Sequence, residues 1–369
     1  MLRQALRSIA HDRKPADGVD DAAALADLLL LYRFAQRDVG SRRSVQTSRE
    51  VGEAQLRVVE RRQILFAVKR ALNDADVRWM VVKGPVIAAR FYPAEWTRQY
   101  NDIDIVVHPD DVGGAIDALC DAGAKMLDRN WGMIARKRQG EVSLVYGSTL
   151  LDLHWHFYSS PSIRRRCGVN MRAVLNRRRE TNLSGLTVPI MDDLDGLIFL
   201  ATHAVLSGGH RAKWMLDFAF AFRTLNPPLA ELFVRAREHD AALQLAVMIQ
   251  RVEDSLGVAI GNPQRFLSRP ENLWMCLCAT TGRYAPVESS LSGRVTGRAV
   301  FSATRDSLTT SVLAMVENLI DAGEGRLRGR SEADVDRTVL HSPGGTEEDR
   351  EEWLRVASAE GGGVTRWSR

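Results

Sequence analysis

The feature that most restricts the fold of this chain is a short apolar strand that begins with two acids. Residues 102–107 read Asp-Ile-Asp-Ile-Val-Val. Strands disfavour Asp, and neighbouring like charges repel. Because side chains alternate between the two faces of a strand, Asp102 and Asp104 share one face, while Ile103 and Ile105 point into a core on the other. The pattern predicts a sheet with one packed face and a pair of carboxylates on the opposite face.

Two interpretations of this acid pair follow from the pattern. Asp-x-Asp occurs four times in the sequence, and the other three pairs suit a polar turn, a helix start and a charged tail. The pair at 102 and 104 is either a solvated edge strand with both acids in water, or a cation site. A divalent cation between two carboxylates converts their repulsion into binding, and Mg²⁺ prefers one or two carboxylates together with substrate phosphates.

The order of elements around this strand predicts an α+β fold with a small mixed sheet. The pattern of apolar residues and turn residues indicates where each element lies. The predicted helices are 22–38, 48–73, 86–92 and 110–122, and the predicted strands are 77–82, 102–107, 132–137, 141–146, 149–157 and 186–190. A turn at Gly147-Ser148 joins two of these strands as a hairpin.

Helical patterns replace strands after residue 191. They cover 192–206, 211–224, 228–239, 241–256, 271–283 and 308–321, after a basic linker at 163–179. We therefore expect N-terminal helices (1–75), a mixed-sheet core (76–190), a helical domain (191–320) and a largely disordered tail (321–369) rich in charge and glycine. Within that tail, 348–359 also fits a short helix.

Composition narrows the classes of partner. The net charge is only +4 over 369 residues, and no long basic block is present, so charge does not argue for a nucleic-acid partner. The four cysteines lack the C-x-x-C spacing of a zinc site or redox pair and suit a reducing compartment. The N-terminus has no signal-peptide pattern, and no apolar run is long enough to span a bilayer. We expect a cytoplasmic protein without a membrane partner.

A turn before the acid pair is suited to anions. Lys83-Gly84 follows a predicted strand and precedes a predicted helix. A glycine there lets backbone N–H groups approach an anion at a helix N-terminus, and a lysine meets phosphate as a point charge. An ordinary strand-to-helix turn is the alternative interpretation.

A third acid lies on a later strand. Residues 150–157 read Leu-Leu-Asp-Leu-His-Trp-His-Phe, which places Asp152, His154 and His156 on one face. If this strand neighbours 102–107, all three acids come within reach of one another. Three carboxylates holding one or two metal ions suit nucleotidyl transfer. A zinc-type site made by Asp152, His154 and His156 is the competing interpretation.

These motifs together resemble the uncharacterised nucleotidyltransferase family, which is related to the polymerase-beta-like nucleotidyltransferases. The resemblance covers roughly 50–225, including a helical segment at 203–222. The residues that carry it are Lys83-Gly84, Tyr92-Pro93, Arg98, Asp102-Ile103-Asp104 and Asp152-Leu153-His154-Trp155.

The resemblance implies an enzyme that moves a nucleoside monophosphate from an NTP to an acceptor and releases pyrophosphate. Asp102, Asp104 and Asp152 would be its catalytic acids and the ligands of Mg²⁺ or Mn²⁺, with Asp152 also a candidate base. Lys83 and Gly84 would form the loop at the triphosphate. Arg98 would contact phosphate.

The helical region adds further candidates. A spacing of seven aligns His203, His210 and Asp217 on one face, unless Gly208-Gly209 breaks the helix between them. Capping and surface pairing, including a Lys213–Asp217 pair, is one interpretation. The other places Lys213 or His210 in the cleft, and we count Lys213 among the predicted nucleotide-binding residues.

Two rival functions remain open. A sugar-nucleotide glycosyltransferase also uses Asp-x-Asp with a metal ion, but it would need a longer doubly wound domain upstream, where this chain predicts helices. A binding or adaptor protein that kept the fold without catalysis is the second rival. The sequence does not identify the NTP, the oligomeric state or the acceptor, which is a small molecule, a peptide, a protein or an RNA.

Overall fold

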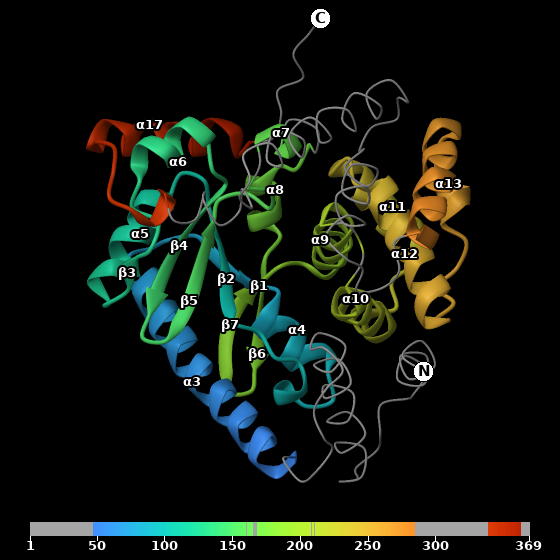
Figure 1. The fold of residues 1–369 in the computed structure, drawn as a ribbon, viewed down its shortest axis with the longest axis horizontal. Coiled ribbons are helices and arrows are strands. Elements are labelled where there is room, and N and C mark those ends of the chain that lie inside the picture. Colours follow the sequence, from blue (N-terminus) through green and yellow to red (C-terminus); the bar gives the residue numbers. More distant parts are fainter. Residues whose placement is uncertain are drawn as a thin grey trace, which may run out of the picture.

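The fold is a mixed sheet covered by helices, seen in a computed structural model that describes residues 47–159, 161–164, 168–207, 209, 211–284 and 339–362 (Figure 1). The predicted helices at 22–38 and 308–321, and His210, lie outside these residues. The seven strands have the order β3-β4-β5-β2-β1-β7-β6. Their bounds are β1 Trp79–Val82, β2 Asp102–Val107, β3 Lys125–Met126, β4 Glu141–Tyr146, β5 Thr149–His154, β6 Arg179–Leu183 and β7 Leu186–Ile190.

Helices precede, interrupt and follow this sheet, which confirms the predicted α+β class. Those of the sheet-bearing part are α3 Thr47–Asp74, α4 Gly84–Phe91, the 3₁₀ turn η1 Glu95–Thr97, α5 Val112–Asp121, α6 Trp131–Lys137, α7 Pro161–Arg164 and α8 Met171–Asn176. Those that follow are α9 Asp193–Leu206, α10 Ala212–Leu225, α11 Leu229–Glu238, α12 Ala242–Leu256, η2 Pro263–Phe266, α13 Arg269–Tyr284 and α17 Glu347–Glu360. None of the helices in the described ranges is both long and apolar enough to cross a membrane.

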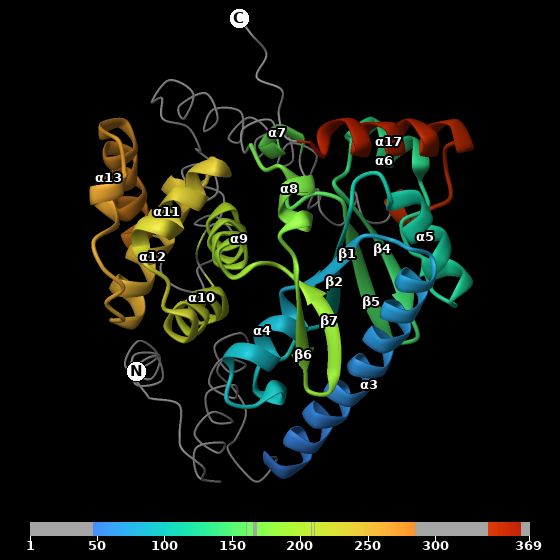
Figure 2. The same cartoon turned by 180° about the vertical axis from the view of Figure 1, so that it is seen from behind.

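The two faces of the sheet have different environments. Ile103 and Ile105 of β2 are fully buried in a core that includes Val68 and Leu72 of α3, and α3 runs the length of the sheet in the view from behind (Figure 2). On the other face, Val106 packs with residues of α8 and α9. The alternation predicted for residues 102–107 is therefore confirmed, and the second face lies toward the helical part of the chain.

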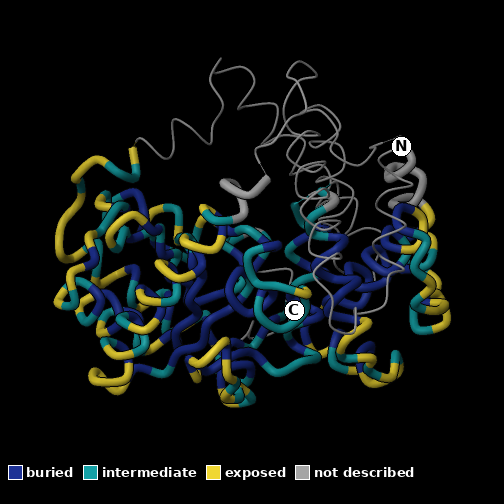
Figure 3. Tube along the Cα trace, turned by 90° about the horizontal axis from the view of Figure 1, so that it is seen from below, coloured by how far each residue is buried: buried dark blue, intermediate teal, exposed yellow. Residues whose placement is uncertain are grey.

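The helices after β7 have a core of their own. It is formed by apolar residues of α9, α10, α11, α12 and α13. Buried backbone accordingly runs through both the sheet and the helical part (Figure 3). The element that joins the two is α9, since its Phe199 belongs to the core of the second sheet face while its other apolar residues belong to the helical core.

The strand predicted at 132–137 is wrong, because these residues form helix α6. Asn130 caps the helix by accepting a hydrogen bond from the Met133 N–H at 3.0 Å. Ile134 is fully buried on the inner side of α6, and the Trp131 ring lies 5.7 Å from the ring of Trp353 in α17. An apolar run of six residues does not distinguish strand from helix, and packing against a distant helix decided between them.

The described part of the tail, 339–362, is ordered and packed, so the expected disorder is wrong for these residues. Thr346 and Asp349 form a reciprocal capping box at the start of α17. The Trp353 side chain is fully buried, and its indole N–H donates to the Gln139 carbonyl at 2.7 Å. The linker expected at 163–179 likewise contains the end of α7 and the whole of α8. Tertiary contacts order segments that look polar in sequence.

Candidate active site

The sheet register brings the three predicted acids together. Strands β2 and β5 are parallel neighbours, with Asp104 opposite Asp152 and Asp102 opposite Leu150. The alternation of side chains puts Asp102, Asp104 and Asp152 on the same sheet face, the one that lies toward α9. Strand β1 runs antiparallel on the other side of β2, with Val82 opposite Asp104, so the residue after β1 reaches the same place. That residue is Lys83.

Asp104 is held by two cationic side chains. The Lys83 ammonium donates to Asp104 Oδ1 at 2.7 Å, and His154 Nε2 lies 3.1 Å from the same oxygen. On its other side, His154 Nδ1 lies 2.8 Å from the Glu141 carboxylate. The side chain of Asp104 is only 6% exposed. The four residues therefore form a row of alternating charge, Lys83–Asp104–His154–Glu141, which is buried at Asp104 and His154 and partly exposed at its two ends.

The pKa values in this row follow from the pairing. Burial alone would raise the pKa of Asp104, but Lys83 and His154 hold it well below its usual range. Burial opposes the charge of Lys83 and His154 as well, yet the adjacent carboxylates hold the pKa of both above the ordinary values. The pKa of Glu141 is lowered by His154, again against the effect of burial. All four groups are ionised near neutral pH.

The other two acids differ from Asp104. Asp152 Oδ1 accepts a hydrogen bond from the Ser143 hydroxyl at 2.8 Å. Burial, aided by Asp104 and Glu141 and opposed by His154, raises the pKa of Asp152 to about 6. Asp102 is partly exposed at the start of β2, and no side chain in the described ranges hydrogen-bonds its carboxylate. The cluster thus contains one fully paired acid, one with a raised pKa and one open to solvent.

The donor chemistry of this cluster fits a hard divalent cation that is shared with a ligand. Carboxylate oxygens are what Mg²⁺ binds, usually together with substrate phosphates. Among the described residues, however, no group of three His, Cys, Asp or Glu is arranged to hold a metal ion by itself. The zinc-type alternative finds no support there either, because both ring nitrogens of His154 already face carboxylates. His156 instead accepts the Tyr158 backbone N–H at 3.1 Å.

The Lys83-Gly84 turn has an unusual backbone and a tight packing contact. Lys83 has φ 50° and ψ −117°, a conformation that non-glycine residues seldom adopt. A Cβ on Gly84 would lie 2.8 Å from Cγ of Tyr100, whose ring is itself covered by Arg61 at 4.8 Å. Glycine is therefore required at 84 by the close approach of the Tyr100 ring, which the motif alone did not indicate.

Gly84→Ala is expected to destabilise the protein by about 1–3 kcal/mol, because the methyl group must displace the clamped Tyr100 ring. A matched control is Gly114→Ala in α5, where an added Cβ meets nothing within 4 Å. That variant should be neutral or up to about 1 kcal/mol more stable, since Ala is the better helix former. Urea unfolding of the two variants measures the difference, and equal midpoints would contradict the packing role of Gly84.

Arg98, predicted at the phosphate, lies in a buried ion pair. Its Nε and one terminal nitrogen donate to the two oxygens of Asp217 in α10, at 3.1 and 2.7 Å. Its other terminal nitrogen donates to the Gln99 carbonyl at 3.1 Å. The Tyr92 hydroxyl donates to Asp217 Oδ1 at 2.8 Å. The motif residues Tyr92 and Arg98 therefore converge on Asp217 and join this segment to α10.

Lys213 is close to the same network but is bonded differently. Its ammonium donates to the Gln99 carbonyl at 2.8 Å, whereas the sequence suggested a pair with Asp217. In the described residues no carboxylate lies within ion-pair distance of Lys213, so its charge is not neutralised locally. Burial, followed by the charge of Arg98, lowers the pKa of Lys213 to about 8.

His203 faces the acid cluster from α9 as a neutral imidazole. Burial and then the charge of Lys83 lower the pKa of His203 to about 3. Its ring contacts the Trp214 ring edge-on at 5.3 Å and lies 6.3 Å from the Phe199 ring. The alignment of His203 with Asp217 by a spacing of seven does not occur, because α9 ends at Leu206 and α10 begins at Ala212.

Two residues of the cluster, Glu141 and Ser143, were missed from the sequence. They lie on β4 opposite His154 and Asp152, respectively. A signal existed, because a two-residue turn at Gly147-Ser148 sets the hairpin register and therefore pairs these positions. The predicted hairpin is confirmed, and its register places both residues beside the strand that carries Asp152 and His154.

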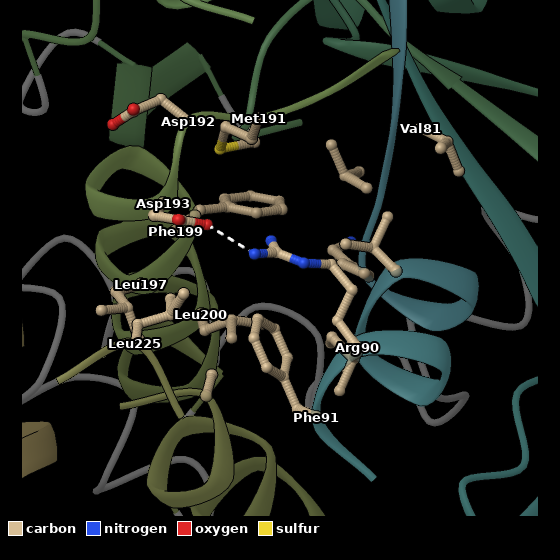
Figure 4. A pocket seen from close by; sticks show the side chains of 16 residues that line it. Val81, Arg90, Phe91, Met191, Asp192, Asp193, Leu197, Phe199, Leu200 and Leu225 are labelled. Atoms are coloured by element: carbon tan, nitrogen blue, oxygen red, sulfur yellow. Dashed lines mark ion pairs between the residues drawn. The ribbon is translucent and has the colours of Figure 1, made fainter. Parts of the chain in front are cut away.

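An apolar pocket adjoins this cluster beyond Phe199. It lies between α4 on one side and α9 and α10 on the other, with about 410 Å³ of empty space that includes open solvent. Arg90 extends from α4 and pairs with Asp193 of α9 at 2.9 Å (Figure 4). Its lining is mostly apolar, its Arg90 is paired, and Lys83 is the residue that it shares with the cluster, so the pocket alone does not suit a triphosphate. The polar cluster on the sheet is the better candidate.

The family of the chain is shown by sequence comparison. The model of the family described as "Uncharacterised nucleotidyltransferase" matches residues 41–257, which is more than half of the 369 residues. The match includes β1 to β7, and with them Lys83, Asp102, Asp104 and Asp152. No curated protein matches the sequence. The chain belongs to the uncharacterised nucleotidyltransferase family.

Proposed function

We propose that this protein is a metal-dependent nucleotidyltransferase that moves a nucleoside monophosphate from an NTP to an acceptor and releases pyrophosphate. The observation that carries the proposal is the meeting of three carboxylates from β2 and β5 on one sheet face, beside the lysine that follows β1. Asp102, Asp104 and Asp152 would hold Mg²⁺ or Mn²⁺, which supplies charge stabilisation for the phosphates. Family membership supports nucleotidyl transfer in general.

The residues of the chain itself would orient the NTP and offset its charge. Lys213 has an ammonium bonded to a carbonyl rather than to a carboxylate, which leaves its charge for a phosphate. Arg98 would act as a positioning residue, because its guanidinium is bound to Asp217 and fixes the segment that carries Gln99. Catalysis by such a site is mainly positioning and electrostatic stabilisation.

The test is transfer of radiolabel from α-labelled NTPs, with Mg²⁺ or Mn²⁺, to small-molecule, peptide, protein and RNA acceptors. Asp102→Asn is the cleanest variant, because Asp102 has no side-chain partner in the described ranges and its loss should not unfold the protein. We expect transfer to fall by on the order of 10²–10³-fold. Asp121→Asn, at the exposed end of α5, is the matched control and should transfer like the wild type. Equal transfer by Asp102→Asn and wild type would refute the assigned role.

Lys213 gives a pH dependence to the same reaction. Its pKa of about 8 means that the ammonium loses its charge above that pH. The neighbouring charges are Arg98 and Arg211, which lower the pKa, and Asp217 and Asp102, which raise it. We expect kcat/KM for the NTP to fall by about tenfold per pH unit above the pKa of the free enzyme. In Lys213→Arg, which keeps its charge, this fall should disappear. An identical profile in both proteins would contradict a phosphate contact.

A non-catalytic binding or adaptor protein is the second candidate. The observation in its favour is that Asp104 Oδ1 already accepts from Lys83 and His154, as in a site whose acids serve structure. Calorimetry with Mg²⁺ and each NTP separates the two, since the enzyme must bind both. The described residues before the Asp pair form α3, β1, α4 and η1 rather than a doubly wound domain, so the glycosyltransferase alternative gains no support.

A further inference from the structure

Lys83 occupies the position that a cation on Asp104 would need. Its ammonium lies 2.7 Å from Asp104 Oδ1, which also faces His154 at 3.1 Å. In the part of the chain that the structure describes, Asp104 is the one carboxylate within ion-pair distance of Lys83. A divalent ion bound to Asp104 would thus lie close to a resident positive charge, and their repulsion is strong where solvent is excluded.

The two cations on Asp104 differ in how firmly they are held. His154 is fixed from both sides, by Asp104 and by Glu141, and its side chain is 7% exposed. Among the residues that the structure describes, Lys83 is hydrogen-bonded to one side chain, that of Asp104, and its own side chain is 18% exposed. Its other neighbour is the ring of Phe199, 5.3 Å from the ammonium. A lysine on a flexible four-carbon chain can exchange partners, whereas a histidine between two carboxylates cannot.

The substrate would bring an alternative partner for the Lys83 ammonium. Lys83 immediately precedes helix α4, Gly84–Phe91, whose second residue, Pro85, has no N–H to donate. A phosphate at this turn would therefore meet the ammonium together with the remaining N–H groups of the helix N-terminus. A triphosphate carries more negative charge than one carboxylate and competes for Lys83. Release of Lys83 from Asp104 removes the positive charge that opposes a metal ion.

We propose that Lys83 and a divalent cation compete for Asp104, so that the metal site opens when an NTP phosphate takes over the lysine. Metal binding then requires bound nucleotide. In the nucleotide-free enzyme, the Lys83 ammonium disfavours the binding of free metal ions. The inference rests on the proposed function, because it assumes that the anion at this turn is the triphosphate of an NTP.

Two binding measurements on the full chain test this competition. In the first, Mn²⁺ binding without nucleotide is followed by electron paramagnetic resonance. Lys83→Met and Lys83→Gln should each bind Mn²⁺ at least about tenfold more tightly than the wild type, while Lys83→Arg should not. Lys69→Met is the matched control, since it removes a lysine that donates to the Thr187 carbonyl rather than to Asp104, and it should change the affinity by less than about threefold. In the second, Lys83→Met should bind inorganic tripolyphosphate in EDTA about tenfold more weakly.

Thermal unfolding gives a further readout, because the melting temperature of each variant is compared with that of the same variant without Mn²⁺. Removal of Lys83 leaves Asp104 short of one partner, so Mn²⁺ should raise the melting temperature of Lys83→Met and Lys83→Gln more than that of the wild type. Equal or weaker Mn²⁺ binding by both neutral variants, or unchanged tripolyphosphate binding, would overturn the inference.

These results are distinguishable from a failure of the proposed function. If the wild type transfers label but the neutral variants gain no Mn²⁺ affinity, the function stands and the competition is refuted. If the neutral variants gain Mn²⁺ affinity but the wild type transfers no label to any acceptor, the competition stands and the function is refuted.

Discussion

Replacing Asp104 by Asn is expected to abolish nucleotidyl transfer and to destabilise the protein by about 3–5 kcal/mol. The stability loss arises because removing one partner of a buried charge pair leaves the other charges uncompensated. Here two cations, Lys83 and His154, depend on the same carboxylate oxygen. The activity loss follows because the same carboxylate is the central one of the three proposed metal ligands. Denaturation by urea measures the first effect, and transfer of label measures the second.

Asp102→Asn provides the control for this prediction, since it should impair transfer with little change in stability.

The pH dependence of stability supplies an independent check on the Asp104 prediction. Because pairing depresses the folded-state pKa of Asp104, its stabilising effect is present above the unfolded pKa of about 4 and is lost as the pH falls toward the folded pKa. Wild type should lose more stability on acidification below pH ~4 than Asp104→Asn does. An Asp104→Asn variant as stable as the wild type would show that the charge row contributes nothing to folding.

Breaking the Arg98–Asp217 pair is the second change with a large expected effect. The two side chains are 8% and 3% exposed, and the contact is bidentate. Arg98→Met and Asp217→Asn should each cost about 3–5 kcal/mol, because each leaves a buried unpaired charge. The double variant should lose clearly less than the sum of the two, since neither charge is then left alone.

The exposed pair Arg70–Asp74 is the matched control for this experiment. Its side chains are 76% and 71% exposed, so Arg70→Met should change the free energy of unfolding by less than about 0.5 kcal/mol. Transfer activity should fall in Arg98→Met as well, because Arg98 and Lys213 both bind the Gln99 carbonyl beside the cluster. If the losses of the two single variants simply add in the double variant, the side chains do not act as a pair.

The part of the candidate site that could be predicted from sequence is the part that depends on the alternation of side chains along a strand. Alternation placed Asp102 and Asp104 on one face, and the hairpin turn contained the register that pairs Ser143 with Asp152. That β2 and β5 are neighbours had to be assumed in the sequence prediction. Parallel strands are joined by a long connection, which leaves no local signal of their pairing. The structure supplies it through the register of Asp104 against Asp152.

The features that the sequence did not reveal share one cause, which is that the deciding partner lies far away in the chain. Residues 132–137 were predicted as a strand, and their helix is stabilised by α17, whose Trp353 bonds a carbonyl 214 residues earlier in the sequence. The ion pair of Arg98 with Asp217 was not foreseen either, because Asp217 is 119 residues away; the phosphate contact of Arg98 stays a prediction. Neither partner leaves a trace in the local pattern of apolar and polar residues.

The sequence by itself determined the faces of the strand at 102–107, the hairpin around Gly147-Ser148, and which residue types could form an acidic cluster. These properties depend on backbone geometry over a few residues, where the periods of 2 and 3.6 apply. Only the tertiary structure decided which charges pair: Lys83 and His154 with Asp104, and Arg98 with Asp217. Pairing of buried charges is set by packing, because each ion needs its partner wherever solvent is excluded, regardless of distance along the chain.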